Sequence, residues 1–242
     1  MPIADSAASI HSLEQRIKSA LEAVNAQITA ACMQAERGVD EVTLLAVSKA
    51  QPTADIRYAY QAGQRHFGEN YVQEALDKIH ALSDLQDIIW HFIGPLQSNK
   101  SKDVAEHFDW LHSLERLKVA RRLNQQRAHK PVPLQVLIQI NIDDEDTKAG
   151  IELAQLSDFA KQVNALEHLS LRGLMAIPQA TASAAERTAS FARLATAFTS
   201  LQADYPNVDT LSLGMSGDLN TAIQHGSTMV RIGTAIFGQR KG

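Results

Sequence analysis

The stretch "TLLAVSKAQP", Thr43–Pro52, contains the pattern from which the fold can be inferred. The apolar run from Leu44 to Val47 predicts a buried strand, and a helical stretch follows Pro52 and closes at Gly63. The strand itself ends in Ser48 and Lys49. Burying an ammonium group is costly unless its charge is paired or removed, so Lys49 needs a specific role at this position.

The same unit, a strand followed by a helix, recurs along the chain. The further strand-like segments are "RHFGEN", "DIIWHFIG", "DWLHSL", "PLQVLIQINI", "LSLRGLMAIP", "TLSLGMS" and "TMVRIGTAIFG". Alternation of this kind implies a parallel sheet, and about eight units in about 200 residues fit a closed (β/α)8 TIM barrel. An open doubly wound sheet is the structural alternative.

We expect the chain to form one domain spanning residues 1–242. Apolar residues at helical spacing predict an extra amphipathic helix from about Ser9 to Ala35, ahead of the first strand. Residues 1–8 and 239–242 are predicted to be loose termini. No stretch rich in Pro, Gly and Ser divides the chain.

Composition excludes several classes of protein. Hydrophobic residues make up 45% of the 242 residues and charged residues 21%, as in ordinary globular proteins. A net charge of −4 without a long basic block argues against a nucleic-acid surface. No uncharged apolar run approaches the ~20 residues of a membrane span. The single Cys32, which we expect to pack within a helix, suits a reducing compartment, so we expect a cytoplasmic protein. We also expect a monomer.

Lys49 lies on the same strand parity as Leu45 and Val47. If Val47 points into the barrel, Lys49 does so too, at the barrel mouth where βα loops carry the chemistry of this fold. Two interpretations remain open. Lys49 is either a strand-end lysine that extends its charge to water, or a desolvated amine that forms an imine with an aldehyde.

Two glycine-containing turns after the seventh and eighth strands favour a phosphate ligand. "SLGMSGDLNTAI" places glycines around Ser216, and "RIGTAIFG" places Gly233 and Thr234 after Arg231. Backbone amides in such turns bind anions, and these two loops form the usual phosphate site of barrel enzymes. Each turn alone is weak evidence, because turns commonly contain glycine.

Arg231 shares strand parity with Met229, so it is predicted to point inward on the last strand. In a closed barrel that strand adjoins the first, which places Arg231 beside Lys49. An imine-forming amine, a phosphate site and an inward arginine together describe a pyridoxal phosphate site.

Other chemistries match the sequence less well. "GMSGD" lacks the second glycine of a nucleophile elbow, and there is neither a Walker A motif nor a strand-linked G-x-G-x-x-G. The nine histidines form no H-E-x-x-H motif, so no metal site is expected. His91, at a strand end, is compatible with either a ligand contact or a structural role. The acidic segment 143–146 is expected to be a solvated loop, and neither it nor Lys148 receives a role.

At these positions the sequence resembles the YggS/PROSC family of pyridoxal phosphate homeostasis proteins. The matching stretches are "LLAVSKAQP", "HFGENYVQEALDK", "WHFIGPLQSNK", "LHSLERLKVARRLN", "NIDDEDTKAGI", "LRGLMAIP", "LSLGMSGDLNTAI" and "VRIGTAIFG". The family is similar in fold to the N-terminal barrel domain of alanine racemase (fold-type III), without that enzyme's β-rich second domain.

The resemblance implies a role for each candidate residue. Lys49 would hold the cofactor as an imine (aldimine), and Arg231 would face its pyridine nitrogen. The remaining cofactor-binding residues would be Ser216, Gly233 and Thr234 at the phosphate, and Asn70, Met215 and His91 along the ring. No residue is assigned a catalytic or metal-binding role.

The resemblance also implies a carrier that buffers pyridoxal phosphate and delivers it to apoenzymes, with effects on amino-acid and keto-acid balance and no established catalysis. The alternative is an amino-acid racemase or a related fold-type III enzyme that uses the same imine. A racemase needs a second acid/base group opposite Lys49, which alanine racemases supply as a tyrosine from the extra domain of a partner subunit. None of the chain's four tyrosines, Tyr58, Tyr60, Tyr71 and Tyr205, is obviously placed for that role, which favours the carrier.

Overall fold

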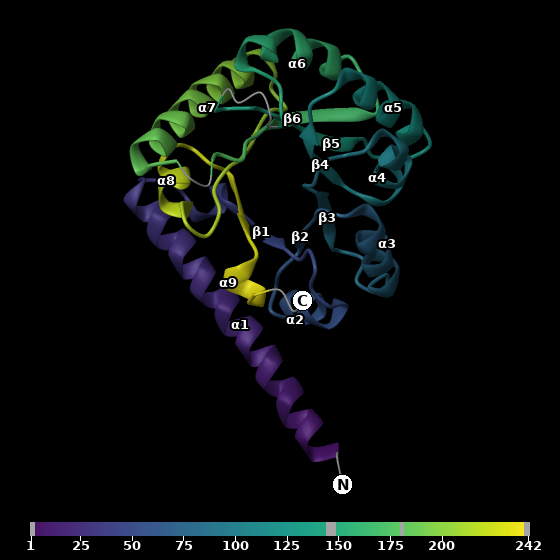
Figure 1. Cartoon of the computed structure of the whole chain (residues 1–242), viewed down its shortest axis with the longest axis vertical. Coiled ribbons are helices and arrows are strands. Elements are labelled where there is room, and N and C mark those ends of the chain that lie inside the picture. Colours follow the sequence, from purple (N-terminus) through teal and green to yellow (C-terminus); the bar gives the residue numbers. More distant parts are fainter. Residues whose placement is uncertain (1–2, 144–148, 180–181, 240–242) are drawn as a thin grey trace.

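In the computed structural model, eight parallel strands form a closed barrel in chain order, from β1 to β8 (Figure 1). The predicted (β/α)8 barrel is therefore confirmed, and the open sheet is excluded. The structure describes residues 3–143, 149–179 and 182–239, with side chains from residue 12 onward. The strands are β1 (Thr43–Val47), β2 (His66–Glu69), β3 (Ile89–Phe92), β4 (Trp110–Leu114), β5 (Leu134–Gln139), β6 (Leu169–Met175), β7 (Thr210–Ser212) and β8 (Met229–Ile232).

Helices follow the strands and surround the barrel (Figure 1). Short 3-10 turns, η1 (Val39–Glu41), η2 (Ser98–Lys100) and η3 (Leu153–Gln155), precede β1, α4 and α6. The helices after the first are α2 (Thr53–Gln61), α3 (Val72–Ala81), α4 (Ser101–His107), α5 (Leu117–Arg127), α6 (Leu156–Asn164), α7 (Ala184–Asp204), α8 (Leu219–Gln224) and α9 (Thr234–Phe237).

The first helix, α1 (Ile3–Gln34), packs against α2, α8 and α9, and its N-terminal part projects beyond the barrel (Figure 1). Its predicted apolar stripe is confirmed, because Ile17, Leu21 and Val24 are buried. Cys32 is a buried free thiol on the same helix, as expected. The helix begins earlier than predicted, so residues 3–8 are helical where a loose terminus was expected. Residues 1–2 and 240–242 lie outside the described part of the chain.

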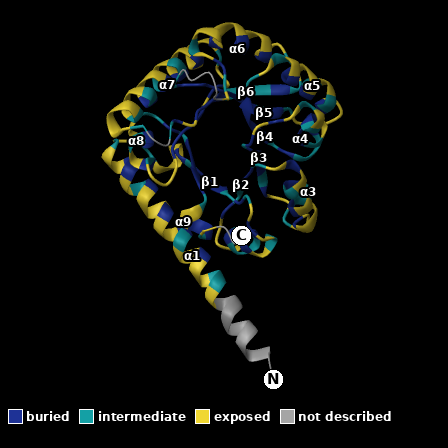
Figure 2. Cartoon of the chain, viewed as in Figure 1, coloured by how far each residue is buried: buried dark blue, intermediate teal, exposed yellow. Residues whose placement is uncertain are grey.

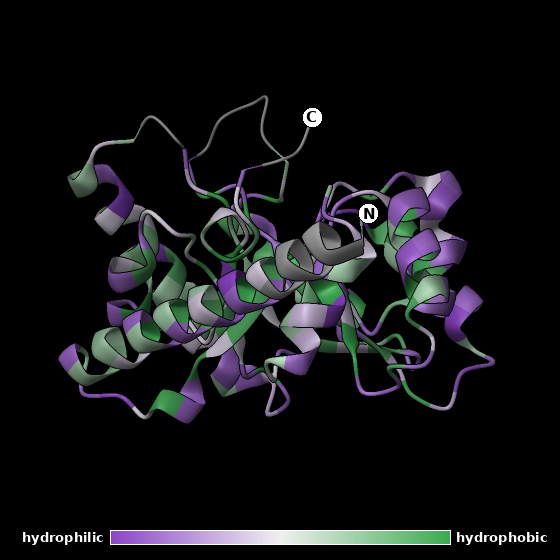
Figure 3. Ribbon diagram, turned by 90° about the horizontal axis from the view of Figure 1, so that it is seen from below, coloured by the Kyte–Doolittle hydropathy of each residue, from purple (hydrophilic) through white to green (hydrophobic). Residues whose placement is uncertain are grey.

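In the part of the chain that the structure describes, the core contains two clusters of buried apolar side chains. Most buried apolar side chains lie between the strands and the helices, and Figure 2 shows buried strands inside helices with exposed outer faces. The same helices carry hydrophilic and hydrophobic residues side by side (Figure 3). A second, smaller cluster contains Trp110, Leu137 and Met175, packed with Ile89. Among the helices as far as they are described, none is long and apolar enough to cross a membrane.

Barrel closure places the first and last strands side by side. β8 pairs with β1 so that Arg231 lies opposite Leu45 and Ile232 opposite Ala46. The sequence prediction that Arg231 adjoins the Lys49 strand is therefore confirmed. This register determines which residues meet at the carboxyl ends of the two strands.

Candidate functional site

A pocket of about 340 Å³ opens where the strands end. Residues from β1 and β8, and from the segments that follow β1, β2, β3, β6, β7 and β8, line it. The sequence analysis named seven of these: Lys49, Asn70, Met215, Ser216, Arg231, Gly233 and Thr234. The other lining residues, which were given no ligand contact, are Val47, Ile93, Ile177 and Gly217. Strand alternation points Val47 and Ile93 into the barrel, since both share the parity of residues assigned to its interior.

Lys49 stands two residues beyond the end of β1 and is half-buried. Val47 and Lys49 both line the pocket, as strand parity predicts. A lysine that only extended its charge to water would lie among exposed residues. The position of Lys49, beside a buried arginine, instead favours the interpretation as an amine that meets a ligand.

The turn after β7 brings Ser216 and Gly217 to the pocket, where both are exposed. Asp218 holds this turn, because its Oδ1 accepts a hydrogen bond of 2.6 Å from the amide of Met215. Gly214 has a φ of +96°, and a Cβ there would lie 2.5 Å from the Cβ of Ala222, so the turn requires glycine. The turn therefore presents a hydroxyl and a stretch of backbone to the pocket.

The turn after β8 brings Gly233 and Thr234 to the same pocket, at the start of α9. A Cβ on Gly233 would lie 3.1 Å from the carbonyl oxygen of Val47, which is tighter than most real contacts. Glycine thus allows β8 to leave the barrel close to β1. The hydroxyl of Thr234 is exposed beside it.

Arg231 is a buried cation, 5% exposed, that lines the pocket from β8. Its guanidinium donates to the carbonyl oxygen and hydroxyl of Ser212, at 2.7 and 2.8 Å, and to the carbonyl oxygen of Ala176, at 2.9 Å. Burial lowers the pKa of Arg231 to about 10, and the nearby carboxylate of Asp218 opposes this shift. Arg231 therefore stays protonated at neutral pH and is fixed in orientation by three acceptors.

Asn70 lines the pocket just after β2, and its Oδ1 is buried without a hydrogen-bond partner in the described structure. Gly94 makes room for it, since a Cβ there would lie 2.2 Å from the carbonyl oxygen of Asn70. A buried acceptor without a donor is uncommon in proteins. This oxygen is therefore available to a donor on a ligand.

His91 does not line the pocket, in contrast to the other candidates. It lies fully buried in the barrel, with its Nε2 3.0 Å from Nδ1 of His66 and its Nδ1 2.9 Å from Nε2 of His112. Strand parity correctly points His91 inward, but Ile93, two residues further on, occupies the pocket position. These contacts favour the structural role that the sequence analysis left open for His91, and its contact with a ligand stays a prediction.

The histidines connect to Arg231 through Ser212, whose Oγ lies 3.2 Å from Nδ1 of His112. Arg231 also donates to this Oγ, at 2.8 Å. A continuous chain of polar contacts therefore runs from Arg231 through Ser212, His112 and His91 to His66. Burial lowers the pKa of His91 and of His112 well below the ordinary value, so both are neutral.

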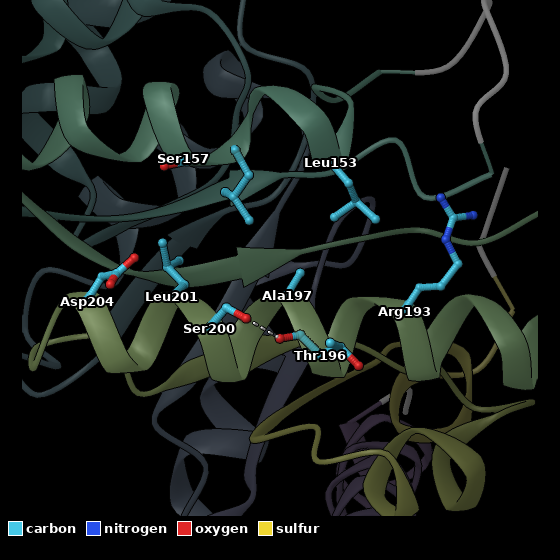
Figure 4. A pocket seen from close by; sticks show the side chains of 9 residues that line it. Leu153, Ser157, Arg193, Thr196, Ala197, Ser200, Leu201 and Asp204 are labelled. Atoms are coloured by element: carbon cyan, nitrogen blue, oxygen red, sulfur yellow. Dashed lines mark hydrogen bonds between the residues drawn. The ribbon is translucent and has the colours of Figure 1, made fainter.

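A second pocket, of about 440 Å³, lies outside the barrel between α6 and α7 (Figure 4). Apolar side chains such as Leu153 and Leu201 face it, and the hydroxyl of Ser200 donates to the carbonyl oxygen of Thr196 rather than into the space. None of the residues singled out from the sequence reaches this pocket. It offers no lysine and no glycine turn, so it is not the candidate site.

Within the residues that the structure describes, no group of three or more His, Cys, Asp or Glu side chains is arranged to hold a metal ion. Asp143, at the start of the acidic segment, accepts hydrogen bonds from the amide of Gln179 and the hydroxyl of Ser190. Residues 144–146 and Lys148, to which the sequence assigned no role, lie outside the described residues.

The sequence of this chain matches known proteins over most of its length. A family model described as "Alanine racemase, N-terminal domain" matches residues 20–241. The pyridoxal phosphate homeostasis protein of Escherichia coli (strain K12) is 54% identical over 222 residues, covering 91% of this chain and 95% of the relative. The protein of that name from Pseudomonas aeruginosa is 51% identical over 217 residues, covering 90% and 93%.

Solved structures agree with these relatives. PipY of Synechococcus elongatus, in a structure with PLP bound, is 38% identical, has a TM-score of 0.80, and aligns over 92% of this chain and 100% of its own. Alanine racemase from Corynebacterium glutamicum aligns over 95% of this chain and 62% of its own with a TM-score of 0.70, but at 14% identity it shows the fold alone. With half of its residues identical to relatives over nearly its full length, this chain belongs to the pyridoxal phosphate homeostasis protein family, on an alanine racemase N-terminal domain-like barrel.

Proposed function

We propose that this chain binds pyridoxal 5′-phosphate in the Lys49 pocket and acts as a carrier that buffers the cofactor and delivers it to apoenzymes, affecting amino-acid and keto-acid balance without catalysis of its own. The observation that carries the proposal is that one pocket is lined by an amine, two glycine-containing turns and a buried arginine. Relatives that share half of their residues with this chain are named for the same cofactor.

The pocket residues fit this cofactor. When bound, pyridoxal phosphate supplies an aldehyde that reacts with an amine and a ring that accepts electrons. Lys49 provides the amine, and its Nζ would bond to the aldehyde carbon with release of water. The buried and unpartnered Oδ1 of Asn70 would accept a hydrogen bond from the ring hydroxyl.

The two turns provide the phosphate site in this proposal. Ser216 and Thr234 offer exposed hydroxyls, and Gly217 and Gly233 let backbone amides approach the phosphate closely. Hydrogen bonds to a charged acceptor are about twice as strong as neutral ones. The phosphate would therefore supply much of the affinity, while Met215 would lie along the ring.

Arg231 favours a carrier over an enzyme. A protonated arginine donates to the pyridine nitrogen and so keeps that nitrogen unprotonated, which weakens the ring as an electron sink. The pKa of about 10 leaves Arg231 protonated across the physiological range. Its three bonds to Ser212 and Ala176 hold it in that orientation.

The racemase alternative lacks its second acid/base group among the described residues that line the pocket, since none of them is a tyrosine. Tyr60 bonds to Asp87, and Tyr71 is 58% exposed at the start of α3. We further propose that the chain works as a monomer in the cytoplasm, a reducing compartment in which the buried Cys32 stays free.

A chiral assay tests the carrier against the racemase. The purified protein, loaded with cofactor and mixed with a panel of L-amino acids, should produce no D-enantiomer at a steady rate. The same loaded protein should activate a cofactor-free aminotransferase. Steady production of D-enantiomer that is lost in Lys49→Ala would replace the carrier with a racemase.

Ser216→Ala tests the phosphate site. Losing one hydrogen bond to a charged acceptor should weaken binding of pyridoxal phosphate by about 10- to 150-fold, which corresponds to roughly 1.5–3 kcal/mol. Pyridoxal without phosphate, measured by the same titration, should bind weakly and equally to both proteins. Equal affinity of the parent protein for pyridoxal and for its phosphate would show that these turns hold no phosphate.

A further inference from the structure

Lys78, on α3, is a buried ammonium group whose hydrogen bonds are all made within the protein. It is 4% exposed. Its Nζ donates to the carbonyl oxygen of Ser48 at 2.7 Å, to Oε1 of Glu69 at 2.8 Å and to Oε1 of Glu74 at 2.6 Å. An ammonium group has three protons, so these three acceptors use its full capacity and fix its position.

The same two carboxylates also hold the backbone on either side of Lys49. The hydroxyl of Ser48, the residue before Lys49, donates to Oε1 of Glu69 at 2.6 Å. The amide of Ala50, the residue after it, donates to Oε1 of Glu74 at 2.6 Å. One cluster, made of Glu69, Glu74 and Lys78, thus reaches both neighbours of the pocket lysine.

Ala50 adopts an unusual conformation at this point. Its φ is +57°, in the left-handed region, and it is not glycine. For an L-residue other than glycine, the left-handed conformation is about 5 to 30 times less populated than the right-handed one. It therefore persists only where the surrounding structure imposes it. Two contacts impose it: the bond from its amide to Glu74, and the turn bond of 3.0 Å from the Gln51 amide to the Ser48 carbonyl oxygen. Release of Ala50 from Glu74 would loosen the chain just after Lys49.

The cluster contains a buried carboxylate oxygen without a hydrogen-bond partner among the described residues, which is energetically costly. Glu69 is fully buried, and its Oε2 has no hydrogen-bond partner in the described structure. Burial raises the pKa of Glu69, while the Lys78 ammonium and the Ser48 hydroxyl oppose this shift. A cluster needed only for packing would be replaceable by apolar side chains at little cost, so its presence beside the pocket points to a further role.

We propose that Lys78 is a positioning residue for Lys49: with Glu69 and Glu74, it fixes the backbone from Ser48 to Ala50 so that the Lys49 amine faces the pocket before the ligand arrives. Such preorganisation strengthens binding, because the segment need not be ordered when the ligand binds. The cofactor measurement below rests on the proposed function, whereas the hydrogen-exchange measurement does not.

Two variants of Glu74 separate the effect of its accepting oxygen from the effect of its negative charge. Glu74 is partly exposed, with 31% of its side chain accessible, so its replacement should leave the fold intact. Glu74→Gln keeps an oxygen that can accept from Ala50 and Lys78, whereas Glu74→Ala removes it. Amide exchange at Ala50 in the cofactor-free protein should accelerate at least about tenfold in Glu74→Ala and remain near the parent rate in Glu74→Gln.

Lys78→Met removes the centre of the cluster, and Arg127→Met is its matched control. Arg127 is also a buried cation, 5% exposed, that donates to backbone carbonyls, those of Ala105, Phe108 and Val132, but it lies on α5 outside the pocket. Lys78→Met and Glu74→Ala should each bind pyridoxal phosphate about tenfold more weakly, the factor expected from releasing Ala50. Glu74→Gln and Arg127→Met should bind like the parent.

Three results would overturn the proposal: parent-like Ala50 exchange in Glu74→Ala, parent-like affinity in Lys78→Met and Glu74→Ala, or an equal loss of affinity in Arg127→Met. The last would show a general effect of losing a buried cation. If Lys78→Met does not fold, the Glu74 pair decides the matter alone. If the parent protein itself does not bind the cofactor at Lys49, the proposed function fails, while the exchange measurement still tests the positioning.

Discussion

Replacing Lys49 by alanine should abolish covalent attachment of the cofactor. When the parent protein is incubated with pyridoxal phosphate and treated with borohydride, the reduced cofactor should remain on the peptide that contains Lys49. Lys49 is the lysine among the described pocket-lining residues, beside the proposed phosphate site and Arg231. Without its amine, the described lining offers no lysine that can form an imine with the aldehyde, so peptide mass spectrometry should find no label there in Lys49→Ala.

Lys102→Ala provides the matched control for this experiment. Lys102 lies on α4, and 68% of its side chain is exposed, so its loss should leave the label on Lys49 unchanged. A label that maps to Lys100 or Lys148 would contradict the assignment. Unaltered binding to Lys49→Ala, measured by equilibrium titration, would contradict it as well.

The free energy of unfolding should fall steeply below pH 6.5 because two histidines are buried in the neutral form. The pKa values of His91 and His112 are lowered well below normal in the folded protein, and each is about 6.5 in the unfolded chain. As the pH falls, the unfolded state therefore binds protons that the folded state does not. Stability is full above pH 6.5 and should fall continuously as the pH is lowered from 6.5 to 5.

Urea unfolding at a series of pH values measures this loss. His112→Gln cannot take up the proton, so the pH-dependent part of its unfolding free energy should shrink by about half. The control is His129→Gln, which removes an exposed histidine and should leave the slope unchanged. Glu69, whose pKa is raised, works in the opposite direction below its folded-state pKa and reduces the net slope. Constant stability from pH 6.5 to pH 5 would contradict the neutral histidine chain.

Simple periodicity predicted much of the site. Alternation of side chains along a strand placed Lys49 and Arg231 inside the barrel, and closure of eight strands made them neighbours, as the pairing of β1 with β8 confirms. Periodicity does not predict how deep in the barrel a side chain lies. His91 and Ile93 share a parity, and only the stagger of the strands decides that Ile93 reaches the pocket while His91 lies below it.

The sequence analysis missed Lys78. Four residues after Glu74 on a helix, it matches an ordinary exposed pair of opposite charges. A signal was nevertheless present, since the buried residues of α3 are Val72, Ala75 and Lys78, which recur at a helical spacing. A lysine on the apolar face of a helix that follows a strand-end glutamate predicts a buried ion pair. Its bond to the Ser48 carbonyl depends on tertiary contacts that the sequence does not reveal.

The pairing of β1 with β8 joins the two ends of the chain at the pocket. A ribosome makes β1 and Lys49 well before Arg231 and the Gly233–Thr234 turn. A nascent chain therefore has no complete pocket until β8 has been made and has paired with β1. A ligand bound at this pocket in turn resists reopening of the barrel between its first and last strands.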